Sequence, residues 1–139
     1  MNEHSEQLNE LVVALVKAHE EMSICVPSTV NTFLKSKYAN LADLQQTARP
    51  VLGKYGLEII QYPTKSATGE DEYVTMLLHV SGQWVKARST VRIDKNDKNE
   101  LQGFGKSTSY IGRYQYKGLA GVIVTGKHAE AWSRIHLLL

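Results

Sequence analysis

Apolar residues recur at intervals of three and four near the start of the chain, which predicts two helices. The first covers residues 5–22 with Ser5 as its N-cap, and the second covers residues 40–55 and ends at Gly56. We expect Pro50 to kink the second helix or split it in two, because proline lacks the backbone N–H of a helix interior. The apolar face of the first helix would consist of Leu8, Leu11, Val12, Leu15, Val16 and His19.

After the second helix the apolar period changes from helical spacing to alternation, which predicts strands. Three strands are expected at residues 57–62, 73–79 and 83–93. The tight turn at 80–83 would join the last two strands into a hairpin, whereas the polar residues 64–71 would form a longer connection between the first two.

A third helix is expected after Gly105, with Ser107, Thr108 or Ser109 as its N-cap. The other expectations, in chain order, are a break or short extended piece at 22–32, a polar loop at 31–37, a short strand or buried turn at 118–125 and a last helix at 129–139. N-terminal helices, a three-stranded antiparallel sheet and a following helix make an α+β fold, here in one domain over residues 1–139.

The segment 102–114, QGFGKSTSYIGRY, permits two interpretations with different functions. Its Gly105, Lys106 and Ser107 match the end of the phosphate-binding loop of nucleotide hydrolases. That motif needs a glycine where this chain has Glu100, and it needs an apolar strand where this chain has a polar turn. Nucleotide hydrolysis is therefore the weaker interpretation.

The second interpretation of the segment is a helix that contacts nucleic acid. Lys106, Tyr110, Arg113 and Lys117 are four, three and four positions apart, so they lie on one helix face. Lysine and arginine neutralise phosphates, and tyrosine stacks on any base. A solvated helix face with its tyrosine packed inward fits the same pattern equally well. The glycines Gly103, Gly105 and Gly112 are expected to allow close approach of the backbone to a phosphate or a neighbouring helix.

Charge is unevenly distributed along the chain, although the net charge is only +2. Residues 1–84 contain six Lys or Arg and ten Asp or Glu, whereas residues 85–117 contain eight and three. The basic part would suit an anionic partner or the acidic part of a neighbouring subunit. Its strand cations Lys86, Arg88 and Arg92 lie an even number of positions apart with no carboxylate among them, so they would share one face of the strand and form our second group of expected phosphate contacts.

Several other classes of protein are disfavoured by the residues present. The five histidines lack the spacing of metal ligands, and no catalytic triad or carboxylate pair is apparent, so we expect no cofactor, no metal and no enzymatic activity. No apolar run is long enough to span a membrane, and the polar residues 1–6 do not predict a secretory signal. A single cysteine, Cys25, favours a reduced thiol in the cytoplasm.

Three segments together resemble the ERF (essential recombination function) family of phage single-strand annealing proteins. They are KSKYANL at 35–41 with RPVL at 49–52 and GL at 56–57, VTMLLHVSGQW at 74–84, and the QGFGKSTSYIGRY segment at 102–114. The resemblance spans about residues 30–121, which leaves the N-terminal helix and a short tail at 126–139 outside it. The acidic segment that usually follows the Arg-Tyr element of the family is missing from residues 121–127.

The resemblance implies ATP-independent binding of single-stranded DNA and annealing of complementary strands in the bacterial host. It also implies a homo-oligomeric ring or filament whose β-β-β-α core lines a basic groove, with a phage exonuclease and the host single-strand-binding protein as partners. Lys35 and Lys37 would close over DNA or dock the next subunit, whereas Tyr38 and Trp84 would support the fold.

Two alternatives to an annealing protein remain open on the sequence. A passive nucleic-acid module would bind single strands without pairing complements. An assembly or scaffold protein would use the basic residues only to meet acidic neighbours. An enzyme ranks last, since only nucleotide hydrolysis that depends on Lys106 would support it.

Overall fold

The computed structural model describes residues 2–31, 36–93, 95–97 and 99–125. It has the α+β architecture expected from the sequence, with the elements, in chain order, α1 (Asn9–Glu21), β1 (Thr29–Asn31), β2 (Ser36–Tyr38), α2 (Leu41–Lys54), β3 (Leu57–Lys65), β4 (Asp71–His79), β5 (Trp84–Thr90) and α3 (Glu100–Ala120). The last helix expected over residues 129–139 lies outside the described residues. No helix of the described chain is long and apolar enough to cross a membrane.

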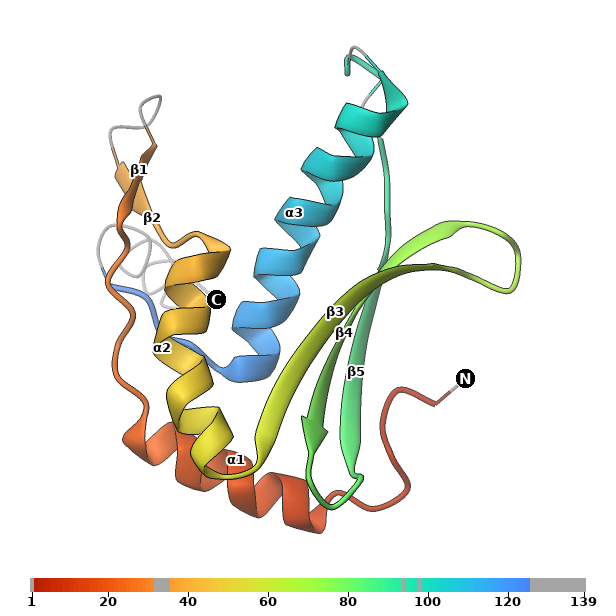
Figure 1. Ribbon diagram of the computed structural model, residues 1–139. Coiled ribbons are helices and arrows are strands. Elements are labelled where there is room, and N and C mark those ends of the chain that lie inside the picture. Colours follow the sequence, from red (N-terminus) through yellow and green to blue (C-terminus); the bar gives the residue numbers. More distant parts are fainter. Residues whose placement is uncertain (1, 32–35, 94, 98, 126–139) are drawn as a thin grey trace, which may run out of the picture.

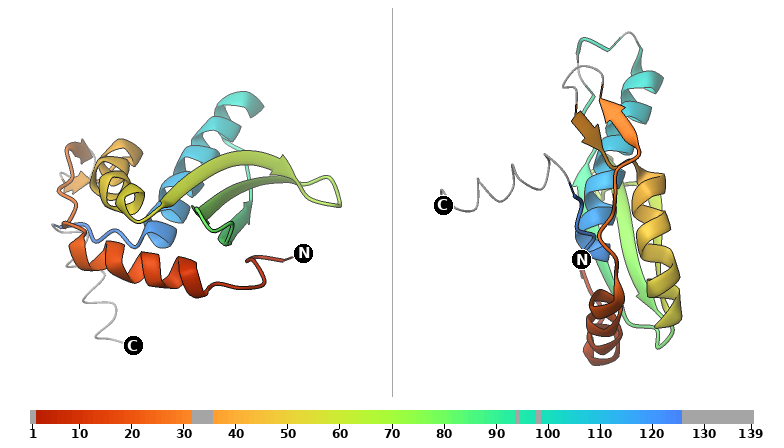
Figure 2. Two further views of the ribbon diagram at one scale, coloured as in Figure 1. Left: turned by 60° about the horizontal axis from the view of Figure 1, so that its bottom comes forward. Right: turned by 90° about the vertical axis from the view of Figure 1, so that its left-hand side faces the viewer.

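The three long strands form an antiparallel sheet in the order β3-β4-β5, and all three helices lie on one of its faces (Figure 1). The core between helices and sheet is apolar and almost solvent-free. Its fully buried side chains include Leu11, Leu44, Leu52, Leu77 and Tyr116. A separate hairpin of β1 and β2 stands beside α2 and α3 (Figure 2).

Helix α1 begins at Asn9, so the expected cap at Ser5 is wrong. The Ser5 hydroxyl instead accepts a hydrogen bond from the Trp84 backbone N–H at 3.0 Å, and the Ser5 N–H donates to the Trp84 carbonyl at 2.9 Å. The expected apolar face is also partly wrong, because Val12 and Val16 are exposed and Ala18 is buried. Both sides of α1 are apolar, and helical spacing alone does not reveal which side meets the core.

Helix α2 is one continuous helix, so Pro50 does not split it. Its start is fixed by a capping box in which the Asn40 side chain accepts from the Asp43 N–H and the Asp43 carboxylate accepts from the Asn40 N–H. Leu44 and Leu52 are buried on either side of Pro50, and this packing outweighs the one backbone hydrogen bond that proline removes.

The sheet confirms the predicted hairpin at residues 80–83, where β4 ends at His79 and β5 begins at Trp84. The expected connection at 64–71 is shorter than predicted, because β3 and β4 extend until Lys65 pairs with Asp71. The third strand ends earlier than expected, at Thr90. The polar loop expected at 31–37 contains part of the β1–β2 hairpin, which polar residues did not predict.

Helix α3 begins at Glu100, well before the expected start after Gly105. Asn99 caps it, since its side-chain oxygen accepts a hydrogen bond from the Gln102 N–H at 2.7 Å. The helix ends at Gly121, which adopts the left-handed conformation with φ of 73°. The following residues then run beside the segment after α1 through a parallel bridge between Val124 and Cys25.

Candidate nucleic-acid interface

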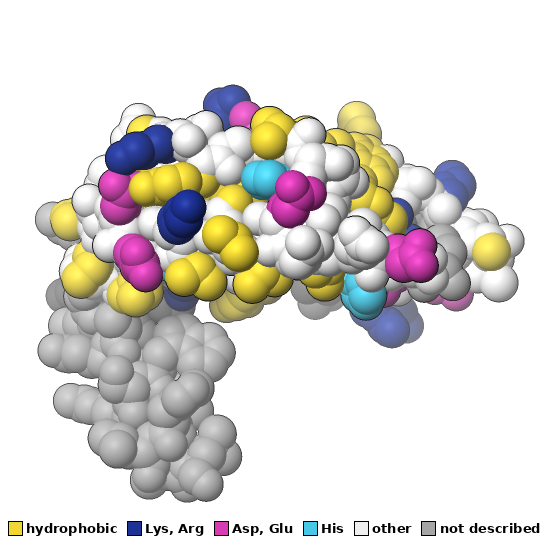
Figure 3. All heavy atoms as spheres, turned by 90° about the horizontal axis from the view of Figure 1, so that it is seen from below, with side chains coloured by type: hydrophobic (Ala, Val, Ile, Leu, Met, Phe, Trp, Pro, Cys, Tyr) yellow, Lys and Arg dark blue, Asp and Glu magenta, His cyan; other side chains and the backbone are white. Residues whose placement is uncertain are grey.

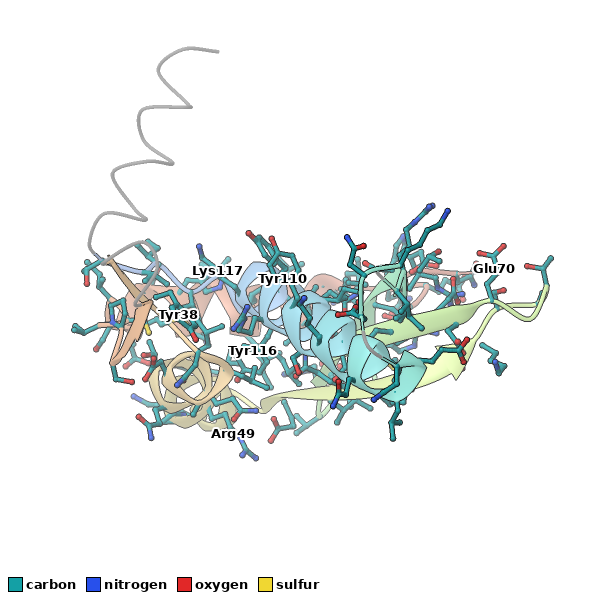
Figure 4. All side chains as sticks on the ribbon, turned by 90° about the horizontal axis from the view of Figure 1, so that it is seen from above. Tyr38, Arg49, Glu70, Tyr110, Tyr116 and Lys117 are labelled. Atoms are coloured by element: carbon teal, nitrogen blue, oxygen red, sulfur yellow. The ribbon has the colours of Figure 1, made fainter. Side chains whose placement is uncertain are left out.

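The row Lys106, Tyr110, Arg113 and Lys117 lies within one helix, as its spacing predicted. The row faces away from the core, because the opposite side of α3 is the buried side. Lys106 and Tyr110 are exposed, whereas Arg113 and Lys117 are half-buried. In Figure 4, Tyr110 and Lys117 lie on one side of the molecule and Arg49 lies on the opposite side.

Tyrosines surround the centre of this row. The rings of Tyr110 and Tyr114 are 4.8 Å apart, and the Tyr110 hydroxyl donates to that of Tyr114 at 3.3 Å. This hydrogen bond, with partial burial, raises the pKa of Tyr114. The guanidinium of Arg113 contacts two rings, 5.3 Å from the centre of Tyr38 and 5.8 Å from that of Tyr110. Tyr38, expected only to support the fold, thus joins β2 to the outer face of α3.

Arg92 joins the row from a different element. It follows β5, and its carbonyl accepts a hydrogen bond from the Ser107 hydroxyl at 2.6 Å. This part of the chain and α3 together line an open hollow of about 570 Å³. Its lining includes Arg92, Lys106, Ser107, Tyr110 and Arg113, which brings three of the predicted cations around one hollow. Lys106 also lies 3.6 Å from the Asp97 carboxylate, so its charge is partly balanced.

The structure excludes the phosphate-binding-loop interpretation. Gly105, Lys106 and Ser107 all lie inside α3, where backbone N–H groups bond within the helix and cannot cradle a phosphate. Among the glycines of the segment, Gly103 and Gly112 allow close approach, but their neighbours are not a helix as expected: a side chain at Gly103 would meet Ile93 and Asp97, and one at Gly112 would meet the ring of Tyr73 in β4. No atom of the described chain lies close to Gly105, so this glycine does not serve packing within the molecule, and its approach to a phosphate stays a prediction.

A buried polar contact that the sequence analysis missed fixes α3 on the sheet. Thr75 of β4 donates from its hydroxyl to the side-chain oxygen of Gln115 at 2.6 Å. The Gln115 amide donates in turn to the Tyr73 carbonyl and the Ser89 hydroxyl, both at 3.1 Å. A glutamine on the buried side of an amphipathic helix was the signal that could have revealed this contact.

Gln61 of β3 extends the contact to a second strand. Its amide donates to the Thr75 hydroxyl at 3.0 Å and to the Gly112 carbonyl at 2.8 Å. Because Gly112 directly precedes Arg113, this bond holds the helix backbone at the middle of the row. Three strands therefore determine the rotation of α3, and with it the direction in which the cations point.

The remaining strand cations do not join this surface. Thr75 and Ser89 both bond to Gln115, so these alternating positions face α3. Side chains alternate along a strand, which places Lys86 and Arg88 on the opposite face of the sheet. The structure therefore separates Lys86 and Arg88 from Arg92, with which they were expected to share a face.

The expectation of a cation row without carboxylates is wrong for Arg88. Its guanidinium lies 3.3 Å from Glu72 on the neighbouring strand and 3.3 Å from Glu3. The side chains of Arg88 and Glu72 are only 19% and 11% exposed, so this pair is largely shielded from water. Lys86 packs its ammonium 5.2 Å from the centre of the Trp84 ring. The carboxylates come from segments distant in sequence, which the local pattern did not reveal.

Two predicted residues cannot be placed as contacts. Lys35 lies outside the described residues, and of Lys37 only the backbone, in β2, is described. Tyr38 is the neighbour of Lys37 in that strand, and its contact with Arg113 brings β2 to the edge of the row. Within the described chain, no group of three His, Cys, Asp or Glu side chains is placed to hold a metal ion.

A sequence model of the ERF superfamily matches residues 12–127 of this chain. Neither curated protein sequences nor solved structures give a significant match. The match includes α2, the sheet and α3, and therefore every described residue of the cation row.

Proposed function

Since the chain belongs to the ERF superfamily, a family of phage-type single-strand annealing proteins, we propose that it binds single-stranded DNA and anneals complementary strands without ATP. The DNA lies along the outer face of α3. Lys106, Arg113, Lys117 and Arg92 contact phosphates, and Tyr110 stacks on a base.

One observation carries the assignment of this face. Arg113 contacts the rings of Tyr38 and Tyr110 and has no carboxylate partner among the described residues. Ring contacts orient a guanidinium but leave its N–H groups available, and these N–H groups match the geometry of a phosphate. A cation that is oriented but not neutralised by an acid is suited to a polyanion.

The proposed activity requires no bond chemistry. Two strands repel each other through their phosphates, and a row of cations lowers that repulsion. Contacts to the sugar-phosphate backbone leave the pairing edges of the bases free to test a second strand. Release of counterions from the bound strand makes the affinity depend strongly on salt.

The assembly, the cellular location and the protein partners that we propose follow from the family. Several copies of the chain assemble into a ring or filament and act in the cytoplasm of the bacterial host. A phage exonuclease supplies the single strands, and the host single-strand-binding protein is exchanged for this protein. Lys35 and Lys37, beside Tyr38, close over the DNA or dock the next copy.

Annealing of two complementary labelled oligonucleotides, without nucleotide and over a series of salt concentrations, tests the proposal. The wild-type chain should accelerate pairing at low salt and lose this effect as salt rises. Binding without accelerated pairing would indicate a passive single-strand module instead, and absence of binding would refute the DNA role.

A matched pair of arginine variants tests the site itself. Arg113→Ala should weaken binding and reduce the slope of log affinity against log salt by roughly 0.7. Arg49→Ala removes an equal charge on the opposite side of the molecule, where Arg49 pairs with Glu58, and should leave the slope unchanged. Equal slopes for the two variants would show that the outer face of α3 is not the binding surface.

A further inference from the structure

The face of the sheet opposite the helices has an apolar surface without a covering element among the described residues. All three helices lie on the other face, and the β3–β4 hairpin bends away from α3 (Figure 1). The register places Ile60 beside Met76 and Leu78 beside Trp84 on this open face. Ile60 is 41% exposed, and the other three are half-buried.

A second apolar surface lies on the outer side of α1. Val12, Val13 and Val16 are 48%, 54% and 52% exposed, although Leu11 and Ala14 on the inner side are buried. Hydrophobic side chains are visible on this underside of the molecule in Figure 3. Valine is a poor helix former, so three exposed valines in one helix are costly unless another surface covers them.

The two surfaces have complementary form and charge. One is a helix and the other is a sheet, and an apolar helix stripe on an apolar sheet face is a common way to pack two layers. Lys86 lies on the sheet face without a carboxylate partner in the described chain. Glu20 lies one helical turn after Val16, exposed and without a cation partner among the described residues.

We propose that α1 of one copy packs its valine stripe onto the open sheet face of the next copy, with Glu20 near Lys86. The two surfaces lie on different sides of the molecule, so the contact is head-to-tail and each copy keeps one surface for a further copy. Such contacts produce a ring when the rotation closes and a filament when it does not. This inference deepens the part of the proposed function in which copies of the chain assemble.

Two variants each remove one surface and add a repelling charge. Val16→Lys disrupts the helix stripe and opposes Lys86, and Ile60→Glu disrupts the sheet face and opposes Glu20. Both positions are exposed, so the variants should fold, and circular dichroism with thermal unfolding verifies this. Leu101→Lys serves as the control, because Leu101 is 82% exposed at the start of α3 and belongs to neither surface.

The readout is the mass in solution, by light scattering or analytical ultracentrifugation, without DNA. The wild-type chain and Leu101→Lys should form assemblies larger than a dimer, whereas each interface variant alone should be a monomer. An equimolar mixture of Val16→Lys and Ile60→Glu should form a dimer, because one intact helix stripe and one intact sheet face remain in the mixture.

The inference would be overturned by a monomeric wild-type chain, by interface variants that keep the wild-type mass, or by a mixture that stays monomeric. A dimeric wild-type chain would overturn it as well, since it indicates a symmetric contact. These outcomes are separate from the DNA role. A monomer that anneals DNA would refute only this inference. An assembly that does not bind DNA would refute only the proposed function.

Discussion

The outer face of α3 and the open face of the sheet both carry cations. In each case the spacing along the sequence places these cations on one face of the helix or strand. Arg113 on α3 contacts two tyrosine rings and no acid of the described chain. Arg88 on the sheet contacts two carboxylates, one from β4 and one from the N-terminal segment. The difference shows that cations which the sequence places on one face are not necessarily available to bind an anion. Acids on neighbouring elements decide which of these cations are neutralised.

The largest expected effect concerns the stability contributed by the neutralised cation. Arg88→Ala should lower the free energy of unfolding by about 3 kcal/mol, because Glu72 would remain largely buried without its partner. Urea denaturation at pH 7 measures this loss. Arg49→Ala breaks an exposed pair with Glu58 and should cost at most about 1 kcal/mol. A small loss of stability for both variants would mean that Glu72 does not neutralise Arg88, so that Arg88 is as available to an anion as Arg113. The contrast between the two surfaces would then fail.

The next effect concerns the polar contact that orients α3. Gln115→Leu should lower the free energy of unfolding by about 2 kcal/mol, because the buried Thr75 hydroxyl loses the acceptor of its proton and the Tyr73 carbonyl loses the Gln115 amide as a donor. Gln102→Leu, at an exposed position of the same helix, is the matched control and should change stability little. If the two leucine variants unfold at the same urea concentration, the contact does not fix the helix.

A smaller effect separates the two surfaces directly. Lys117→Ala on α3 should weaken single-strand binding by about 1 kcal/mol, roughly fivefold, and reduce the salt slope by about 0.7. Lys86→Ala on the sheet should leave that slope unchanged if the sheet face meets protein. Fluorescence anisotropy with a labelled oligonucleotide at several salt concentrations measures both slopes. A reduced slope for Lys86→Ala would support its predicted role as a phosphate contact and place DNA on the open face too.

The smallest effect at neutral pH concerns the inner side of α3. Tyr116 is buried and its hydroxyl has no hydrogen-bond partner among the described residues, so Tyr116→Phe should stabilise the fold by at most about 1 kcal/mol. Burial, with the nearby charge of Glu58, raises the pKa of Tyr116 to about 12 from an ordinary value of 10.0.

The raised pKa of Tyr116 has a consequence at alkaline pH. The folded state keeps the phenol proton of Tyr116 to a higher pH than the unfolded state does. The contribution of Tyr116 to stability is therefore fully present below pH 10 and is lost as the pH rises towards 12. Denaturation curves between pH 9 and 12 should therefore show a steeper loss for the wild type than for Tyr116→Phe. Parallel curves would mean that the phenol is not shielded from water.

Much of the fold could be predicted because its signals are local. Helical spacing and alternation indicated both long N-terminal helices, the three strands and the hairpin at residues 80–83. The row on α3 could be predicted for the same reason, since positions three and four apart share a face in any helix. The start of α3 was missed because glycines at 103 and 105 suggested a loop, whereas Gly103 lies inside the helix where it packs closely against Ile93 and Asp97.

The sequence by itself determined the order of the three described helices and the three long strands, the α+β class, the family and the spacing of the cations. Each of these depends on residues close together in the chain or on their order along it. Only the tertiary structure decided which side of α1 is buried, that Glu3 and Glu72 neutralise Arg88, and that Tyr38 contacts Arg113. Such contacts join distant segments, and their electrostatic and packing energies depend on distances in space that a one-dimensional pattern does not contain.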